Sequence, residues 1–240
     1  MKEFIHSEEA LKTKNISFLG LDAYDYLLYL AKLLTNMNYK VLVIDLSENG
    51  ATSEALHDTS ESVATLLEPS IFHCKGIDYI PQIAGWNYRG EFINSYLYHK
   101  SDEYDYVMTD FGTKVGHTAI LQSTMVCFVI DMQKHNILAY NDLIVQLDIT
   151  KEVVIRNIVP CKIKAQDLIA DIIRGLNQSL LYMEHSEKDL ANQILLQHTR
   201  VIPMNRVSKQ VRQFLLEVVK KLEPEKEIKE IEQAFTLRGK

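Results

Sequence analysis

The sequence predicts a three-layer α/β protein, in which a mainly parallel, twisted sheet is flanked by helices. Short apolar runs alternate along the chain with segments of helical periodicity, as they do in successive βαβ units. Some of these runs, such as "KVLVID" and "MVCFVID", are almost uninterrupted, which is typical of strands buried on both faces. We therefore expect one α/β domain over residues 15–222, preceded by an N-terminal extension over 1–14 and followed by a charged C-terminal helix or tail over 223–240.

The composition fits a globular protein. The 240 residues are 47% hydrophobic and 24% charged, with a formal net charge of -6. This balance, without a cluster of Lys and Arg, gives no strong signal for nucleic-acid binding. The three cysteines are widely spaced, which indicates neither a disulfide framework nor a zinc site. No apolar run reaches the ~20 residues that span a bilayer, so we expect no transmembrane segment and a cytoplasmic location.

Short apolar segments bounded by turn residues are expected to be strands. They are residues 16–20, 40–46, 77–81, 106–110, 125–131, 152–159 and 200–203. The segment 178–185 is ambiguous. Three strands end in an aspartate, Asp45, Asp110 or Asp131. Because the carboxyl ends of parallel strands meet at the edge where α/β proteins bind ligands, we expect polar groups to gather there.

Helices are expected where apolar residues recur three and four positions apart. The first has its buried positions at Ala23, Tyr26, Leu27, Leu30, Ala31 and Leu34. Asp22 is its expected N-cap, and Asp25 completes a variant of the capping box. Ser186 and Asp189 predict the start of a second helix that runs to about Leu196.

A third helix is predicted near the C-terminal end, with Asn205 as its N-cap. Its buried positions are Val207, Val211, Phe214, Leu215, Val218 and Leu222. Beyond Pro224 a thin apolar stripe formed by Ile228, Ile231 and Phe235 predicts a plain surface helix. A docking or membrane-surface helix is the alternative, although the balanced charges of this tail do not favour it.

Five segments, in order, resemble the ParA/MinD group of deviant P-loop ATPases. "KVLVIDLSENGATSEAL" is similar to the second strand and first switch, "GIDYIP" to the strand that follows, and "YDYVMTDFGT" to the Walker B strand. "VVIRNIV" resembles the strand whose Asn contacts adenine, and "RVIPMN" the late strand that ends I-P-x-D/N. The resemblance covers about residues 16–222 and implies a P-loop NTPase fold. Within the group it points to the TadZ/CpaE branch, which localises assembly of Flp-type (Tad) pili.

The resemblance places the phosphate loop at Gly20, Leu21, Asp22, Ala23, Tyr24 and Asp25. A P-loop uses glycines, a Lys and a Ser or Thr to hold phosphates and Mg²⁺. Only Gly20 fits that pattern. The carboxylates of Asp22 and Asp25 would repel a triphosphate. We therefore expect a degenerate Walker A loop and no ATP or Mg²⁺ bound in the usual manner.

Other positions of the ATPase pattern are kept. Asp45 and Asp110 match its strand-end carboxylates, so they would be the catalytic residues of an active protein, and Asp110 would hold Mg²⁺. Asn157, Pro203 and Asn205 match positions near adenine. Alternatively, the two aspartates cap neighbouring loops, and Asn157 suits a turn.

Together these features favour a catalytically degenerate ParA/MinD-like protein, a localisation or scaffolding factor that serves Tad/Flp pilus assembly. The expected partners are a second copy of the chain and proteins of a membrane-associated assembly that recruit it to a membrane or pole. One alternative is an ATP-binding switch that uses Mg²⁺. Another is a partition factor of a plasmid or conjugative element, which would need a basic DNA-binding surface. Residues 85–92, "GWNYRGEF", are a candidate partner-binding loop.

Overall fold

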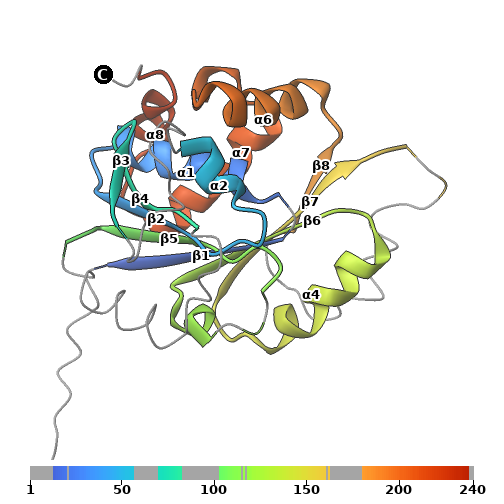
Figure 1. The fold of residues 1–240 in the computed structure, drawn as a ribbon. Helices are drawn as coiled ribbons and strands as arrows, with labels where there is room; N and C mark the ends of the chain where they lie inside the picture. Colours follow the sequence, from blue (N-terminus) through green and yellow to red (C-terminus); the bar gives the residue numbers. More distant parts are fainter. Residues whose placement is uncertain are drawn as a thin grey trace, which may run out of the picture.

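The computed structural model describes residues 13–20, 22–56, 70–82, 103–114, 116, 118–160, 162 and 180–237. These residues form a single sheet with helices on both faces (Figure 1). Leu21, the candidate partner loop 85–92 and nearly all of the expected N-terminal extension lie outside the described residues.

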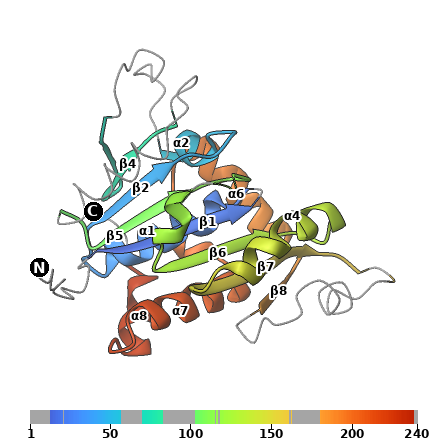
Figure 2. The ribbon, with the colours of Figure 1, turned by 90° about the horizontal axis from the view of Figure 1, so that it is seen from below.

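The strands follow the order β3-β4-β2-β5-β1-β6-β7-β8 across the sheet (Figure 2). Neighbouring strands are parallel except for the antiparallel pair β3 and β4. The strands are β1 (Lys14–Gly20), β2 (Val41–Asp45), β3 (Phe72–Cys74), β4 (Ile77–Ile80), β5 (Tyr106–Asp110), β6 (Met125–Ile130), β7 (Thr150–Ile158) and β8 (Leu180–Glu184). The predicted α/β fold class is confirmed.

The helices lie in two layers (Figure 1). One face of the sheet carries α1 (Tyr24–Asn36), α2 (Ala51–Leu56), α6 (Glu187–Thr199), α7 (Lys209–Leu222) and α8 (Ile228–Ala234). The other face carries α4 (Lys134–Gln146) and the 3₁₀ turn η2 (Thr118–Gln122). A second 3₁₀ turn, η3 (Met204–Arg206), precedes α7.

Each central strand contributes to two hydrophobic cores, one on either face of the sheet. In β2, Val43 packs into the core under α1 and α7, whereas Leu42 and Ile44 pack into the core on the α4 side. Successive side chains of a strand point to opposite faces, so burial on both faces requires an unbroken apolar run. This arrangement explains the sequence "KVLVID".

Helix α1 is buried almost all round. From Tyr24 to Leu34 only Lys32 is not fully buried. The buried surface of the helix is therefore wider than the single apolar face that was predicted. The helix contacts the sheet on one side and α7 and α8 on another. The rings of Tyr26 and Phe214 meet edge to face across the α1–α7 contact, with centroids 5.4 Å apart. A helix enclosed in this way can be apolar in every direction.

Two local predictions for the C-terminal half are wrong. Residues 200–203 are not a strand, because Arg200 ends α6 in a left-handed conformation with φ 54° and the chain then leads into η3. The strand of this region is β8, within the segment that was ambiguous. Asn205 is not the N-cap of α7, since Ser208 Oγ accepts a hydrogen bond from the Val211 N–H at 3.2 Å. The predicted cap at Ser186 is confirmed by its bond from the Asp189 N–H.

The C-terminal helix α8 packs against the body of the protein. Ile231 and Phe235 are buried, and the Arg212 guanidinium lies 4.6 Å from the centroid of the Phe235 ring. Asn36 Nδ2 donates to the Ala234 carbonyl at 2.7 Å, which ties the helix to α1. Ile228, the first residue of the predicted stripe, is 58% exposed. Among the described residues, none of the helices is both long and apolar enough to cross a bilayer.

Candidate functional site

The candidate site lies at the carboxyl edge of β1, β2, β5 and β7. Leu21, Asp22 and Ala23 are the only residues between the end of β1 and the start of α1. Gly20, with φ 135°, donates its N–H to the Gly112 carbonyl at 2.8 Å. A Cβ atom at position 20 would overlap the carbonyl oxygen of Val129 on β6. The strand end is therefore pressed against its neighbours, and the connection is shorter than the G-x-x-x-x-G-K-S/T loop that surrounds phosphates.

Asp22 and Asp25 do not form the predicted capping box. Asp22 has a left-handed backbone with φ 54°, and the N-cap position is Ala23, which has no side-chain cap. The Asp22 side chain is exposed, with Asn49 Nδ2 3.5 Å from its Oδ1. Asp25 is buried and accepts a hydrogen bond from the Tyr26 N–H at 2.9 Å. The predicted repulsion of a triphosphate by the carboxylates of Asp22 and Asp25 therefore needs correction for Asp25, because its side chain is buried and hydrogen-bonded.

The partner of Asp25 is Arg156, which the sequence interpretation did not single out. Its Nη1 and Nη2 donate to the two carboxylate oxygens of Asp25 at 3.2 and 3.1 Å. Nη1 also donates to the Asp22 carbonyl at 2.8 Å, so Arg156 fastens β7 to the β1–α1 connection. The guanidinium carbon lies 5.0 Å from the centroid of the Tyr26 ring. Burial raises the pKa of Asp25, whereas the charge and hydrogen bonds of Arg156 oppose the rise.

Asp45 at the end of β2 holds the loop that follows it. Its Oδ1 accepts from the N–H and the hydroxyl of Ser47, at 2.9 and 2.6 Å. Its Oδ2 accepts from the N–H and the hydroxyl of Ser53 in α2, at 2.7 and 2.6 Å. Both oxygens thus have two donors, which is the arrangement of the capping alternative.

Asp110 lies opposite Asp45 in the register of β5 and β2. Its Oδ2 accepts from the Thr52 hydroxyl at 2.7 Å, and its Oδ1 from the Gly112 N–H at 3.0 Å. Burial, and after it the neighbouring charge of Asp45, raise the pKa of Asp110 to about 7. The two candidate catalytic carboxylates are thus brought together, and both bind the chain's own donors.

The loop after β5 closes the edge from the other side. Glu48 accepts from the Thr113 hydroxyl at 2.7 Å and from its N–H at 3.1 Å. Lys114 Nζ donates to the Leu46 carbonyl. Between this loop and Gly20, Asp22 and Tyr24 a cavity of about 20 Å³ remains. A water molecule needs about 10–15 Å³, so the cavity has the size of about one water and is too small for a phosphate group.

Asn157 lies beside a second cavity, of about 120 Å³. The backbone of Asn157 is left-handed, with φ 57°, a conformation that Asn adopts more readily than most residues. The cavity is mainly polar, and Asp131, Asn136 and Gln193 line it together with Arg156. Arg156 Nε is buried without a hydrogen-bond partner in the described part of the chain.

Pro203 and Asn205 do not line this cavity. They lie in the segment between α6 and α7 and line a different groove, of about 690 Å³, together with Phe235. The structure therefore does not assemble Asn157, Pro203 and Asn205 into one pocket. The three residues were grouped because residues 200–203 were predicted to be a strand of the sheet. In the structure the strand beside β7 is β8.

The fold was compared with solved structures. A ParA family ATPase from Chlorobium tepidum TLS superposes with a TM-score of 0.61 at 15% identity, over 94% of this chain and 100% of that one. A putative plasmid partition protein from Borrelia burgdorferi B31, bound to AMPPNP, gives a TM-score of 0.66 at 16% identity, over 88% of this chain and 100% of that one. The chain has the ParA/MinD fold.

A third structure with this fold is the MinC:MinD cell division protein complex of Aquifex aeolicus, with a TM-score of 0.65 and 14% identity over 90% of this chain and 98% of that one. No protein-family model matches the sequence, and a search of curated proteins gives no match. The ParA/MinD fold is thus established from three-dimensional similarity that spans nearly the whole chain.

The residues at the carboxyl edge fit Mg-ATP poorly. The ParA/MinD fold implies a nucleotide held by the β1–α1 connection, but here that connection is short and the cavity beside it is one water in size. The Asp110 oxygens already accept hydrogen bonds from Thr52 and Gly112. Among the described residues there is no group of three or more His, Cys, Asp or Glu side chains suited to a metal ion.

Proposed function

We propose that this chain is a nucleotide-independent protein with the ParA/MinD fold, which acts as a localisation or scaffolding factor by binding other proteins. The observation that carries the proposal is the closed edge of the sheet. The bidentate pair between Asp25 and Arg156, the short β1–α1 connection and the cavity of about 20 Å³ support a Walker A loop that has lost phosphate binding.

Thermal unfolding with and without Mg-ATP tests the loss of nucleotide binding. A ligand at a hundred times its dissociation constant adds about 2.7 kcal/mol to stability, which raises the melting temperature by several degrees. We expect no shift at millimolar Mg-ATP. A clear shift, or ATP hydrolysis that disappears in Asp110→Ala, would overturn the proposal.

An ATP-binding switch is the second candidate. The cavity of about 120 Å³ beside Asn157 supports it, because Asn136, Asn157 and Gln193 offer amide groups to a planar base. In this case Mg-ATP would stabilise the protein, and the stabilisation would be lost in Asn157→Ala. Wild type and this variant, melted side by side with adenosine and with Mg-ATP, separate the two candidates.

We further propose that the process served is assembly of Tad/Flp-type pili, with a homodimer as the working form and recruitment to a membrane or pole by a partner. The support is the sequence resemblance to the TadZ/CpaE branch, together with the D-x-G arrangement of Asp110 and Gly112. A deletion strain should lose surface pili, and a fluorescent fusion should form discrete foci. Normal piliation in the deletion strain would refute this assignment and leave the nucleotide-independent reading intact.

A further inference from the structure

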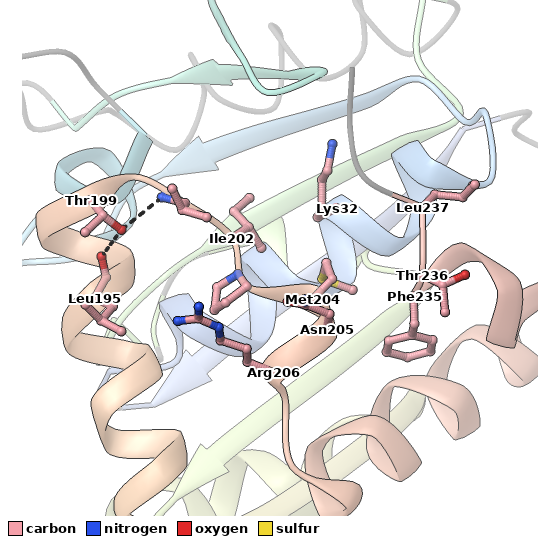
Figure 3. Close-up of a pocket in the computed structure, with 12 residues that line it drawn as sticks. Lys32, Leu195, Thr199, Ile202, Met204, Asn205, Arg206, Phe235, Thr236 and Leu237 are labelled. Carbon is pink, nitrogen blue, oxygen red and sulfur yellow. Dashed lines mark hydrogen bonds between the residues drawn. The ribbon is translucent and has the colours of Figure 1, made fainter.

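A groove of about 690 Å³ lies away from the carboxyl edge, between the loop after α6 and the end of α8 (Figure 3). We call it the α6–α8 groove. Its apolar wall is formed by Leu195, Val201, Ile202, Met204, Phe235 and Leu237. Phe235 and Met204 are only 2% and 6% exposed, whereas Val201 and Leu237 are 53% and 54% exposed. The groove thus has a recessed apolar floor between accessible apolar rims.

The apolar surface continues from the groove along α6. Leu190, Ile194 and Leu195 lie four and five positions apart on this helix, and all three side chains are substantially exposed. Residues four apart share one face of a helix, so Leu190 and Ile194 form an exposed apolar pair on α6, and Leu195 next to Ile194 lines the groove. Exposed apolar side chains gathered near an apolar groove are typical of an interaction site.

The charge of the groove is positive. Its described lining residues include Lys32 and Arg206 and no Asp or Glu, although the chain as a whole carries a net charge of -6. Lys32 lines the groove from α1 (Figure 3), and its Nζ donates to the Lys75 carbonyl at 2.8 Å. Cations beside an apolar floor are complementary to a segment that combines apolar and acidic side chains.

We propose that the α6–α8 groove docks an amphipathic helix of a partner protein that is acidic on one face and apolar on the other. The apolar face would insert large side chains between Val201 and Leu237, and the acidic face would lie against Lys32 and Arg206. The inference rests on the proposed function in one respect, namely that the chain acts by binding other proteins. A recessed floor fits a helix better than a flat lipid surface, which a protruding face rich in Lys and Arg would bind.

Synthetic peptides test the proposal on the full chain. Two sets of labelled amphipathic peptides of about 15 residues share the same Leu and Phe positions and differ in carrying Glu or Lys elsewhere. We expect the Glu set to bind in fluorescence anisotropy and the Lys set not to bind. Val201→Glu should weaken binding at least tenfold, as should Lys32→Glu combined with Arg206→Glu.

Val145→Glu is the matched control, because Val145 lies on α4 across the sheet and is 55% exposed, close to the 53% of Val201. Binding by neither set, equal binding by both sets, or equal loss in Val145→Glu would overturn the proposal. So would a wild-type dimer that Val201→Glu alone converts to a monomer, since a second copy would then occupy the groove. Mg-ATP melting of the same samples reports on the proposed function separately, so either idea can fail alone.

Discussion

The guanidinium of Arg156 on β7 donates hydrogen bonds to both carboxylate oxygens of Asp25 on α1, 131 residues earlier in the chain. Both side chains are buried, with exposed fractions of 7% and 3%. The pair ties the start of α1 to the far half of the sheet. It also lies beside the connection where related folds would hold a nucleotide.

Arg156→Met should destabilise the protein strongly. It leaves the Asp25 carboxylate buried without its cation, a change that costs about 3–5 kcal/mol in comparable pairs. The combined variant Asp25→Leu with Arg156→Met should recover most of this loss, since removing both charges leaves neither unpaired. Urea unfolding at neutral pH measures both. A single variant within about 1 kcal/mol of wild type would show that the pair carries little of the stability.

Asp110→Asn should stabilise the protein at neutral and alkaline pH. The folded pKa of Asp110 is raised to about 7 by burial and by Asp45, so between its unfolded value and 7 the folded state binds the extra proton. This contribution to stability is complete below about pH 4 and is lost as pH rises through 7. The Asn amide can accept from the Gly112 N–H and donate to the Thr52 hydroxyl. We expect the free energy of unfolding, measured in urea, to rise by on the order of 1–3 kcal/mol at pH 8 and by less at pH 5.

Asp45→Asn is the control for this prediction. Both oxygens of Asp45 accept hydrogen bonds from backbone N–H groups, those of Ser47 and Ser53. In the Asn variant the side-chain NH₂ would replace one oxygen and would place a donor against a donor. We expect the free energy of unfolding to fall by about 1–3 kcal/mol. If both Asn variants shift stability in the same direction, the different roles assigned to the two carboxylates are wrong.

Gly20→Ala should be poorly tolerated. A Cβ atom there would overlap the Val129 carbonyl oxygen, which belongs to the neighbouring strand and cannot move aside without disturbing the sheet. We expect a loss of at least about 3 kcal/mol. Gly76→Ala provides the comparison, because Gly76 also has positive φ, at 83°, but no atom of the described residues lies within 4 Å of its Cβ position. It should cost only about 1–2 kcal/mol. Similar losses for the two variants in urea unfolding would argue against the steric cause.

Phe235→Ala tests whether α8 is part of the folded core. Phe235 is buried against α7 and the Arg212 guanidinium, so removal of the ring should cost about 3–5 kcal/mol. Ile228→Ala, at an exposed position of the same helix, should change stability by less than about 0.5 kcal/mol. Differential scanning calorimetry is suitable for both. A separate low-temperature transition in wild type would instead indicate that α8 unfolds independently.

The sheet could be predicted from the sequence because its central strands are buried on both faces. That environment favours near-continuous apolar runs, and β2 and β6 carry them. The start of α6 was also predictable, since a Ser N-cap acts within one turn of helix. Signals of this kind are local and do not depend on the rest of the chain.

The site was less predictable because its contacts are long-range. Asp22 and Asp25 have the spacing of a capping box, but the left-handed backbone of Asp22 and the pull of Arg156 on Asp25 give each another role. Arg156 was visible as the single charge within the apolar run "VVIRNIV". A buried strand Arg requires an acidic partner, and that requirement was the available signal. The late apolar segment "RVIP" resembles a strand, but in the described sheet it pairs with no strand, and β8 lies beside β7.

The ion pair between Asp25 and Arg156 is formed by residues of the chain itself. A hydrolytic switch measures time, because it alternates between states as its ligand is consumed. Under the function proposed above, an edge closed by the chain's own side chains does not alternate between states in this way. The amount of this protein at a given place in the cell would then depend on its abundance and on its binding partners, and not on a nucleotide cycle.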